Sequence, residues 1–425
     1  MGDTANDRGV CGKQSRAVSL AHTAPALLAT VFVVVVLLAG GAYARAVTAQ
    51  AITGLGSALN DQKHPLFEQK NQGSVLQRAA FSRADLLPAY GSSELLDSGE
   101  EYHARVLFRE YAVDFDLFPI AREGAPILGM LQKIAAVGPA AQGEKVVISV
   151  SPGLFLDPMS PADYYAGTFS SLQAGELAFS GDMSRAVKRG AALRMMDYPQ
   201  TLADDPLLRI ALECLSDDSL PAQACSTVLQ PVGRIRNQAL RLQDEFRAMR
   251  LVGDTALASP PNRGDEPAPD WDSLMARAER AYLPVSGNNP FGFWDTYWTG
   301  KQSAIMPAAR SSSDEEFTRR LAASKAWTDL ELVLQGLREL GAEPLVISSP
   351  VHGPYYDYLG VSRTARAGYY ERLRAVAQAN GAALVDFADY EDDRAFATDQ
   401  WGHLSPKGWV AYARVLDEFH RGVLR

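Results

Sequence analysis

The feature that most constrains the fold of this chain is a series of short apolar runs that alternate with stretches of helical periodicity. The clearest run is Lys145–Ser151, which contains Val-Val-Ile-Ser-Val. The other runs cover residues 87–90, 113–120, 345–349 and 383–387. Helical patterns cover residues 127–137, 314–341, 365–380 and 406–420. Short apolar runs between turns indicate buried strands, and strands alternating with helices are typical of a doubly wound, mostly parallel α/β sheet. Ligands bind such sheets at the carboxyl ends of the strands.

Two segments that follow predicted strands carry the residues of a nucleophilic site. Gly91-Ser92-Ser93-Glu94 comes directly after the first run, and Asp399-Gln400-Trp401-Gly402-His403 follows the last one. A serine hydroxyl becomes a nucleophile when a histidine takes its proton and a carboxylate holds the tautomer of that histidine. The sequence therefore predicts acyl-transfer chemistry by a Ser–His–Asp site. The G-x-S-x-G turn of α/β-hydrolases is absent from these segments.

Four sequence blocks resemble one protein family. They are Gly91–Glu94, Asn288–Gly292, Pro350–Gly353 with the following Tyr355–Tyr358, and His403–Trp409. The first and last blocks resemble those of the SGNH (GDSL-like) hydrolase superfamily. Gly-Ser-Ser-Glu in place of Gly-Asp-Ser-Leu resembles the DltD family, the membrane-anchored D-alanyl transfer proteins of teichoic acid D-alanylation. The resemblance extends from the N-terminal apolar run to the last predicted helix.

The resemblance implies roles for three residues. It assigns the nucleophile to Ser93 rather than Ser92, and the base to His403. The family spacing is Asp-x-x-His, whereas this chain has three residues between Asp399 and His403, with Gln400 at the family's carboxylate position. We expect Asp399 to be the carboxylate across this one-residue insertion. The next acid upstream is Asp393.

The resemblance also implies an oxyanion hole. Gly124 matches the glycine of the superfamily's second block, and its N–H is expected to join that of Ser93 in binding the oxyanion. The alternative is an ordinary turn glycine. The asparagine of the third block is missing, since the loop reads Ser151-Pro152-Gly153. His352 also follows a predicted strand and is expected either to line the cleft or to be structural.

By this resemblance, the chain is expected to transfer D-alanyl groups through an acyl-Ser93 intermediate to a cell-envelope polymer. The chemistry requires no metal or organic cofactor. The implied partners are a membrane O-acyltransferase, the acceptor polymer and, upstream, a D-alanyl carrier protein with its ligase. Two alternatives remain: an O-acetyltransferase or esterase acting on an exported polysaccharide, and a non-catalytic scaffold for the membrane O-acyltransferase.

An apolar run over residues 24–44 contains no charged residue and is long enough to cross a bilayer. Arg8, Lys13 and Arg16 precede it, and these charges orient the N-terminus toward the cytoplasm. The alternative is a cleaved signal peptide, because Ala42-Tyr43-Ala44 fits a cleavage site. We therefore expect a single-pass protein of the cell membrane. Its predicted parts are a cytoplasmic N-terminus (1–23), an anchor (24–44), a juxtamembrane segment (45–83) and an extracytoplasmic SGNH-like catalytic domain (84–425).

Between residues 160 and 250 the pattern is helical, with no strand signal, which predicts a helical insertion that can cap the site. The helical runs cover residues 176–194, 207–215 and 232–251. A proline-rich stretch over 258–269 is expected to be a linker. Cys214 and Cys225 flank a short polar turn in this region. They can form a disulfide worth about 2–3 kcal/mol, or remain two buried thiols. The net charge of −9 and the lack of a basic cluster argue against a nucleic-acid partner.

Overall fold

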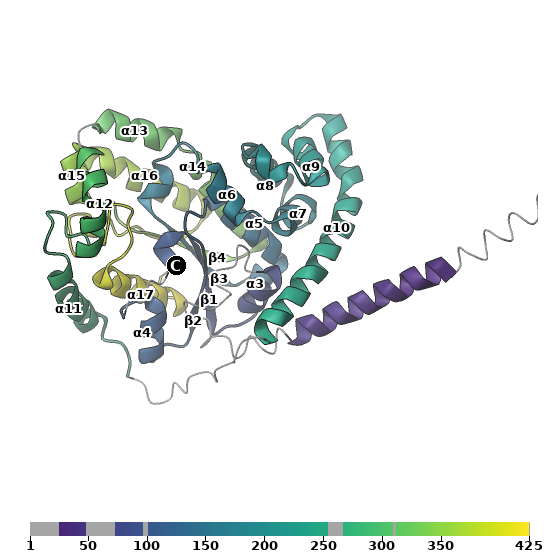
Figure 1. Ribbon diagram of the computed structural model, residues 1–425, viewed down its shortest axis with the longest axis horizontal. Coiled ribbons are helices and arrows are strands. Elements are labelled where there is room, and N and C mark those ends of the chain that lie inside the picture. Colours follow the sequence, from purple (N-terminus) through teal and green to yellow (C-terminus); the bar gives the residue numbers. More distant parts are fainter. Residues whose placement is uncertain (1–24, 48–72, 97–100, 254–266, 309–311, 425) are drawn as a thin grey trace, which may run out of the picture.

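The computed structural model describes residues 25–47, 73–96, 101–253, 267–308 and 312–424. Its centre is a five-stranded parallel sheet with the order β2-β1-β3-β4-β5 (Figure 1). The strands are β1 Leu86–Gly91, β2 Asp116–Ala121, β3 Lys145–Val150, β4 Glu343–Ser348 and β5 Ala383–Val385. The sequence prediction of a doubly wound α/β protein is confirmed.

The strands are apolar because helices cover both faces of the sheet. Every residue of β1 is buried, and β1 pairs in parallel with both β2 and β3. Two hydrophobic cores lie on opposite faces, one built on α3, α5, α14 and α16 and the other on α4, α11 and α17. These helices are α3 Ser74–Phe81, α4 Ala104–Glu110, α5 Ile127–Val137, α11 Trp271–Tyr282, α14 Ala326–Leu340, α16 Arg363–Asn380 and α17 Pro406–His420.

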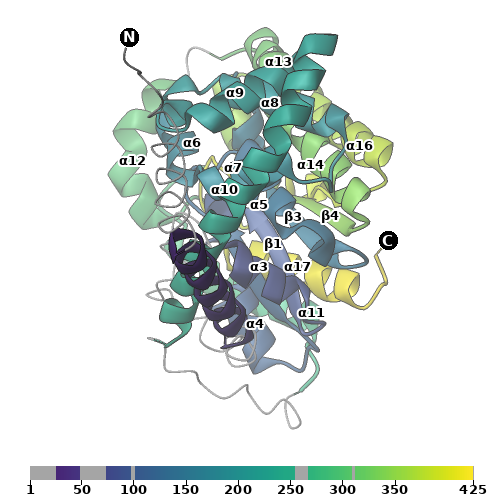
Figure 2. The ribbon, with the colours of Figure 1, turned by 90° about the vertical axis from the view of Figure 1, so that its right-hand side faces the viewer.

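The region expected to be a helical insertion forms five helices. They are α6 Ala162–Thr168, α7 Ser171–Phe179, α8 Arg185–Met196, α9 Pro206–Ser216 and α10 Leu220–Gly253. Helix α7 packs on α5 and α8 packs on α14, so these helices extend one face of the sheet (Figures 1 and 2). The residues of this region that line the pocket containing Ser93 lie at its beginning and include Ser160 and Pro161. Among the residues from α6 to α10, only Tyr164 lines the pocket that contains Ser93.

Two helices expected to be continuous are interrupted. The stretch 314–341 divides into α13 Asp314–Ala323 and α14, because Ser324 and Lys325 donate hydrogen bonds to the backbone of Asp157 and Pro158 instead of continuing the helix. The helical run over 176–194 divides into α7 and α8, and the Ser184 side chain caps the start of α8.

Helix α10 begins earlier than the expected residue 232 and passes through Pro231. A proline inside a helix removes one backbone hydrogen bond. Pro231 lies on the exposed side of α10, where water can bind the freed carbonyl group. A disulfide between Cys214 and Cys225 joins the end of α9 to the start of α10.

Strand β5 ends two residues before the expected residue 387. The Asp386 side chain accepts a hydrogen bond from the Ala388 N–H and pairs with Arg374. Phe387 adopts a left-handed conformation with φ 47°. Both features turn the chain away from the sheet. The remaining helices are α12 Asp295–Ala308 and α15 Gly353–Leu359.

The N-terminal apolar run forms a helix, Pro25–Val47, that is long and apolar enough to cross a membrane. It is the purple helix of Figure 1, and its last turns contact α10. The predicted cytoplasmic segment 1–23 lies outside the described residues, as do most of the juxtamembrane segment 45–83 and most of the linker 258–269.

Candidate active site

Ser93 lies in the turn that ends β1. It begins a short 3₁₀ helix, Ser93–Leu95, at the carboxyl end of the strand. The Glu94 Oε1 atom accepts a hydrogen bond of 2.7 Å from the Ser92 N–H and so fixes the turn. Ser92 is buried, and its hydroxyl donates to the Arg122 carbonyl. Ser93 is only half-buried and lines a pocket, so it is the more accessible of the two serines.

The structure brings Ser93, His403 and Asp399 together in the predicted order. The Nε2 atom of His403 lies 2.9 Å from Ser93 Oγ, and its Nδ1 atom lies 2.5 Å from Asp399 Oδ2. Asp399 is buried, whereas the His403 side chain is 35% exposed. In this arrangement an Nδ1–H donated to the carboxylate leaves Nε2 as an acceptor facing the serine hydroxyl.

The loop that carries His403 explains how the extra residue is accommodated. The Thr398 N–H donates 2.8 Å to the His403 carbonyl, which closes a tight hairpin. Asp399 Oδ1 accepts hydrogen bonds from the N–H groups of Trp401 (2.9 Å) and His403 (3.3 Å). Gly402 has φ 87°, and a Cβ there would lie 2.4 Å from Ser349 Oγ. The hairpin therefore holds Asp399 and His403 face to face despite their unusual spacing.

Asp393, the next acid upstream, and Gln400, at the family's carboxylate position, have other partners. Asp393 forms an ion pair of 2.7 Å with Lys407. The Gln400 Oε1 atom accepts a hydrogen bond of 2.8 Å from the Tyr297 hydroxyl, and burial raises the pKa of Tyr297 to about 12. The hydrogen bonds of the structure therefore associate Asp399, rather than either of these residues, with His403.

Gly124 lies beside Ser93 at the end of β2 and lines the same pocket. Its φ is 68°, and a Cβ at this position would lie 2.7 Å from Cγ of the Tyr164 ring. The positive φ and the closeness of the Tyr164 ring therefore both require a glycine at position 124. Tyr164, from α6, was not identified by the sequence analysis, because nothing in its local pattern separates it from other tyrosines.

The pocket has a volume of about 240 Å³ and contains Ser93 and His403. Glu123, Tyr164 and Trp401 also line it, together with Ser151 and Gly153 of the loop in which the third-block asparagine is missing. Trp401 is 52% exposed, so an aromatic surface borders the opening. Burial raises the pKa of Glu94, the buried acid next to Ser93, although the Ser92 N–H and the neighbouring His403 oppose this shift.

The other described histidines lie away from this pocket. His352 caps α15 by accepting from the Tyr355 N–H, and its ring packs edge-on against Phe293. Burial lowers the pKa of His352 to about 4, which keeps the ring neutral. His103 is buried against Trp409 at the start of α4, and His420 stacks on Phe115. Of the two expectations for His352, the contacts favour a structural role.

The block Asn288–Gly292 positions the loop beside the His403 hairpin. The Asn289 side chain accepts from the N–H of Phe293 (2.9 Å) and donates to its carbonyl (2.7 Å). The adjacent Trp294 N–H donates 3.0 Å to the Thr398 carbonyl. This block therefore ties its own loop to the hairpin.

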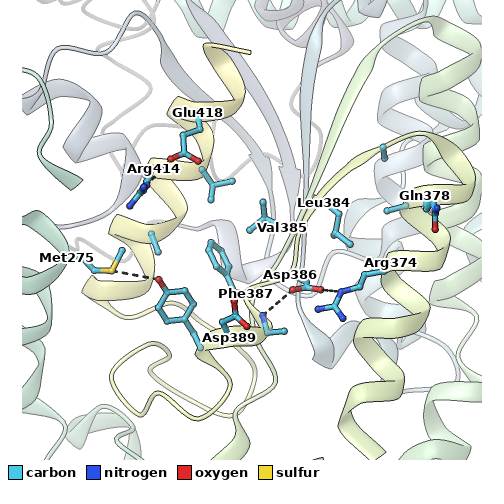
Figure 3. Close-up of a pocket in the computed structure, with 16 residues that line it drawn as sticks. Met275, Arg374, Gln378, Leu384, Val385, Asp386, Phe387, Asp389, Arg414 and Glu418 are labelled. Atoms are coloured by element: carbon cyan, nitrogen blue, oxygen red, sulfur yellow. Dashed lines mark hydrogen bonds and ion pairs between the residues drawn. The ribbon is translucent and has the colours of Figure 1, made fainter. Parts of the chain in front are cut away.

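A second and larger cavity, of about 720 Å³, lies at the β5 edge of the sheet between α16 and α17 (Figure 3). Four of its charged side chains form the ion pairs Arg374–Asp386 and Arg414–Glu418. Of the described residues that line it, none is Ser, Cys or His. The described lining of this cavity therefore holds no Ser–His pair, whereas the Ser93 pocket contains one.

Comparison with known proteins agrees with the sequence blocks. A family model described as "DltD protein" matches residues 64–421. Protein DltD of Bacillus subtilis (strain 168) is 27% identical over 353 residues, which cover 82% of this chain and 86% of the relative. Protein DltD of Staphylococcus aureus (strain NCTC 8325 / PS 47) is 22% identical over 352 residues, covering 83% and 85%. Protein DltD of Lacticaseibacillus rhamnosus is 20% identical over 352 residues, covering 82% and 80%.

Proposed function

Because the chain belongs to the DltD family, we propose that it is a membrane-anchored D-alanyl transferase. It acts in the D-alanylation of teichoic acid or another cell-envelope polymer. The observation that carries this proposal is the chain of contacts from Ser93 Oγ to His403 Nε2 and from His403 Nδ1 to Asp399. This arrangement supports acyl transfer through a serine ester.

In the first half-reaction, Ser93 Oγ attacks the carbonyl carbon of a D-alanyl ester or thioester donor. His403 Nε2 takes the hydroxyl proton, and Asp399 stabilises the resulting imidazolium. The N–H groups of Ser93 and Gly124 stabilise the oxyanion. The bond to the donor then breaks, the leaving alcohol or thiol receives the proton from His403, and D-alanyl-Ser93 remains.

In the second half-reaction, a hydroxyl group of the acceptor polymer attacks the Ser93 ester. His403 Nε2 removes the hydroxyl proton, the Ser93–acyl bond breaks, and the proton returns to Ser93 Oγ. The partly exposed side chain of His403 is consistent with entry of a large acceptor. The carboxylate of Glu123 and the ring of Trp401 line the pocket and are suited to the ammonium group of an alanyl ester.

The proposed location is the cell membrane. The helix Pro25–Val47 is retained as a single-pass anchor, the N-terminus is cytoplasmic and the domain that carries Ser93 is extracytoplasmic. The proposed partners are a membrane O-acyltransferase, a D-alanyl carrier protein upstream and the acceptor polymer. If water replaces the polymer hydroxyl, the same site is an esterase.

The test is complementation of cells that lack their own copy of the protein, with the D-alanine ester content of the isolated envelope polymer as the readout. We expect Ser93→Ala and His403→Gln to lose the D-alanine esters, and the matched control Ser92→Ala to retain them. Full ester content with Ser93→Ala would replace the enzymatic proposal with the scaffold alternative.

A further inference from the structure

Helix α10 carries an apolar face that points away from the domain. Val228, Val232 and Ile235 are 71%, 54% and 73% exposed. Their spacing of four and three residues places them on one side of the helix. Isolated exposed apolar residues are ordinary, but a continuous apolar row on one helix marks a surface that contacts something other than water.

The charges of α10 are distributed unevenly around the helix. Neither of its two acidic residues is on the outward face: Asp244 accepts a hydrogen bond from the Val75 N–H, and Glu245 is 2% exposed because it packs against the N-terminal helix, where it pairs with Arg45. Arg234 and Arg247 are exposed and lie beside the apolar row, and Arg234 also donates a hydrogen bond of 3.0 Å through Nε to the Phe179 carbonyl. An apolar stripe bordered by arginines is the pattern of helices that lie in the interface of a bilayer, where the arginines reach lipid phosphates.

The same face continues into the contact with the apolar N-terminal helix. Leu242 and Phe246 follow Ile235 at helical spacing. An added Cβ at Gly41 would lie 2.4 Å from Leu242, and one at Gly40 would lie 3.2 Å from Phe246. Figures 1 and 2 both show the N-terminal helix and α10 on the same side of the molecule. An ion pair of 2.8 Å between Arg45 and Glu245 fixes the junction.

We propose that the outward face of α10 lies against the surface of the lipid bilayer, next to the point where the anchor enters it. The inference rests on the membrane anchoring of the proposed function. The apolar side chains would enter the boundary between headgroups and acyl chains, and the flanking arginines would bind lipid phosphates. Because the domain is then held at two places, the Ser93 pocket keeps one orientation toward the membrane.

The test uses the full chain in lipid nanodiscs that contain anionic phosphatidylglycerol. A nitroxide is attached to a single cysteine at Ile235 in a Cys11→Ser background that keeps the Cys214–Cys225 disulfide. Its collision rates with oxygen and with a water-soluble nickel complex are then compared. The matched control is Leu283→Cys, which is also apolar and 55% exposed. Leu283 directly follows α11, on the opposite side of the molecule from α10 in Figure 1.

We expect the oxygen-to-nickel ratio at Ile235 to exceed that at Leu283 by about three-fold or more, as at an interfacial site. Equal ratios at the two sites would overturn the inference. A third label, at Val34 within the apolar N-terminal helix, separates the two claims. A lipid-exposed Val34 with a water-exposed Ile235 leaves the anchor intact and removes only the role of α10. Dipolar broadening between Ile235 labels would instead assign this face to a second copy of the chain.

A variant that introduces negative charges tests the same surface without a label at Ile235. Val228→Asp combined with Ile235→Asp should lower the oxygen-to-nickel collision ratio of a nitroxide at Val232, as expected for a more water-exposed site. The matched pair Leu283→Asp and Val285→Asp should leave the Val232 label unchanged. If the α10 pair has no effect on the accessibility of Val232, the apolar face does not hold the helix on the bilayer.

Discussion

Replacing Asp399 by asparagine tests how the carboxylate controls the tautomer of His403. The two Asp399 oxygens have different partners: Oδ1 accepts from the N–H groups of Trp401 and His403, and Oδ2 faces His403 Nδ1. In Asp399→Asn the side-chain oxygen stays with the two backbone N–H groups, because an amide nitrogen cannot accept them. The NH₂ group then faces Nδ1 and donates to it.

This exchange moves the ring proton to Nε2, the nitrogen that lies 2.9 Å from Ser93 Oγ. Nε2 becomes a donor and cannot take the serine proton. In serine proteases the same substitution lowers kcat about 10⁴-fold, which corresponds to about 5.5 kcal/mol of transition-state stabilisation. We expect a loss of this order for Asp399→Asn, with the thermal unfolding midpoint nearly unchanged because both backbone hydrogen bonds remain.

The assay is transfer of D-alanine to purified acceptor polymer by the full-length protein in detergent or nanodiscs. The control is Asp393→Asn, which removes a carboxylate that pairs with Lys407 rather than with His403. Full activity of Asp399→Asn together with an inactive Asp393→Asn would refute the assignment. If both variants are active and His403→Ala is inactive, the site operates as a Ser–His dyad.

Three further predictions concern the surroundings of the site. Gly124→Ala should destabilise the fold by at least about 1–2 kcal/mol, since the φ of Gly124 is 68° and the added Cβ meets Tyr164, and it should lower kcat about 100-fold or more. In the control Gly143→Ala, at φ 75° with open space around the added Cβ, urea unfolding should show only the cost of the backbone conformation, and turnover should be normal. Burial lowers the pKa of His352 from 6.5 to about 4, so between these pH values the unfolded state binds a proton that the folded state does not. The free energy of unfolding should therefore fall by about 3 kcal/mol as the pH drops through that range. This fall should be absent in His352→Gln, and an equal fall in the variant would show that His352 is not its cause. Removing the disulfide with Cys214→Ser and Cys225→Ser should lower the free energy of unfolding by about 3 kcal/mol and leave turnover unchanged. A loss of turnover in the folded variant would contradict a purely structural role for the disulfide.

The sequence predicted the sheet and the meeting of Ser93 with His403, because strand patterns are local and parallel strands bring their carboxyl ends to one edge. It predicted Asp399 as the carboxylate, with Asp393 as the next acid upstream, but it could not supply the geometry that decides between them. That choice depends on the Thr398–His403 hairpin, whose closure is a property of the folded loop. Tyr164 was missed for a similar reason, since its contact with Gly124 depends on the placement of α6.

The extent of α10 was underestimated for a different reason. A proline normally argues against a helix interior. In α10 the packing of the opposite side of the helix on α7 and α9 outweighs the loss of one hydrogen bond at Pro231. The break between α13 and α14 depends on the distant loop at Asp157, which no local pattern reports.

The most direct test of the central claim is covalent labelling of the full-length protein with a serine-reactive phosphonate, followed by peptide mass spectrometry. The account predicts one adduct, on Ser93. The adduct should be absent in Ser93→Ala, retained in Ser92→Ala and strongly reduced in His403→Gln, because His403 is the proposed base for the Ser93 hydroxyl. Undiminished labelling of Ser93→Ala, or an adduct on Ser92 in the unmodified protein, would contradict the assignment of Ser93 as the nucleophile.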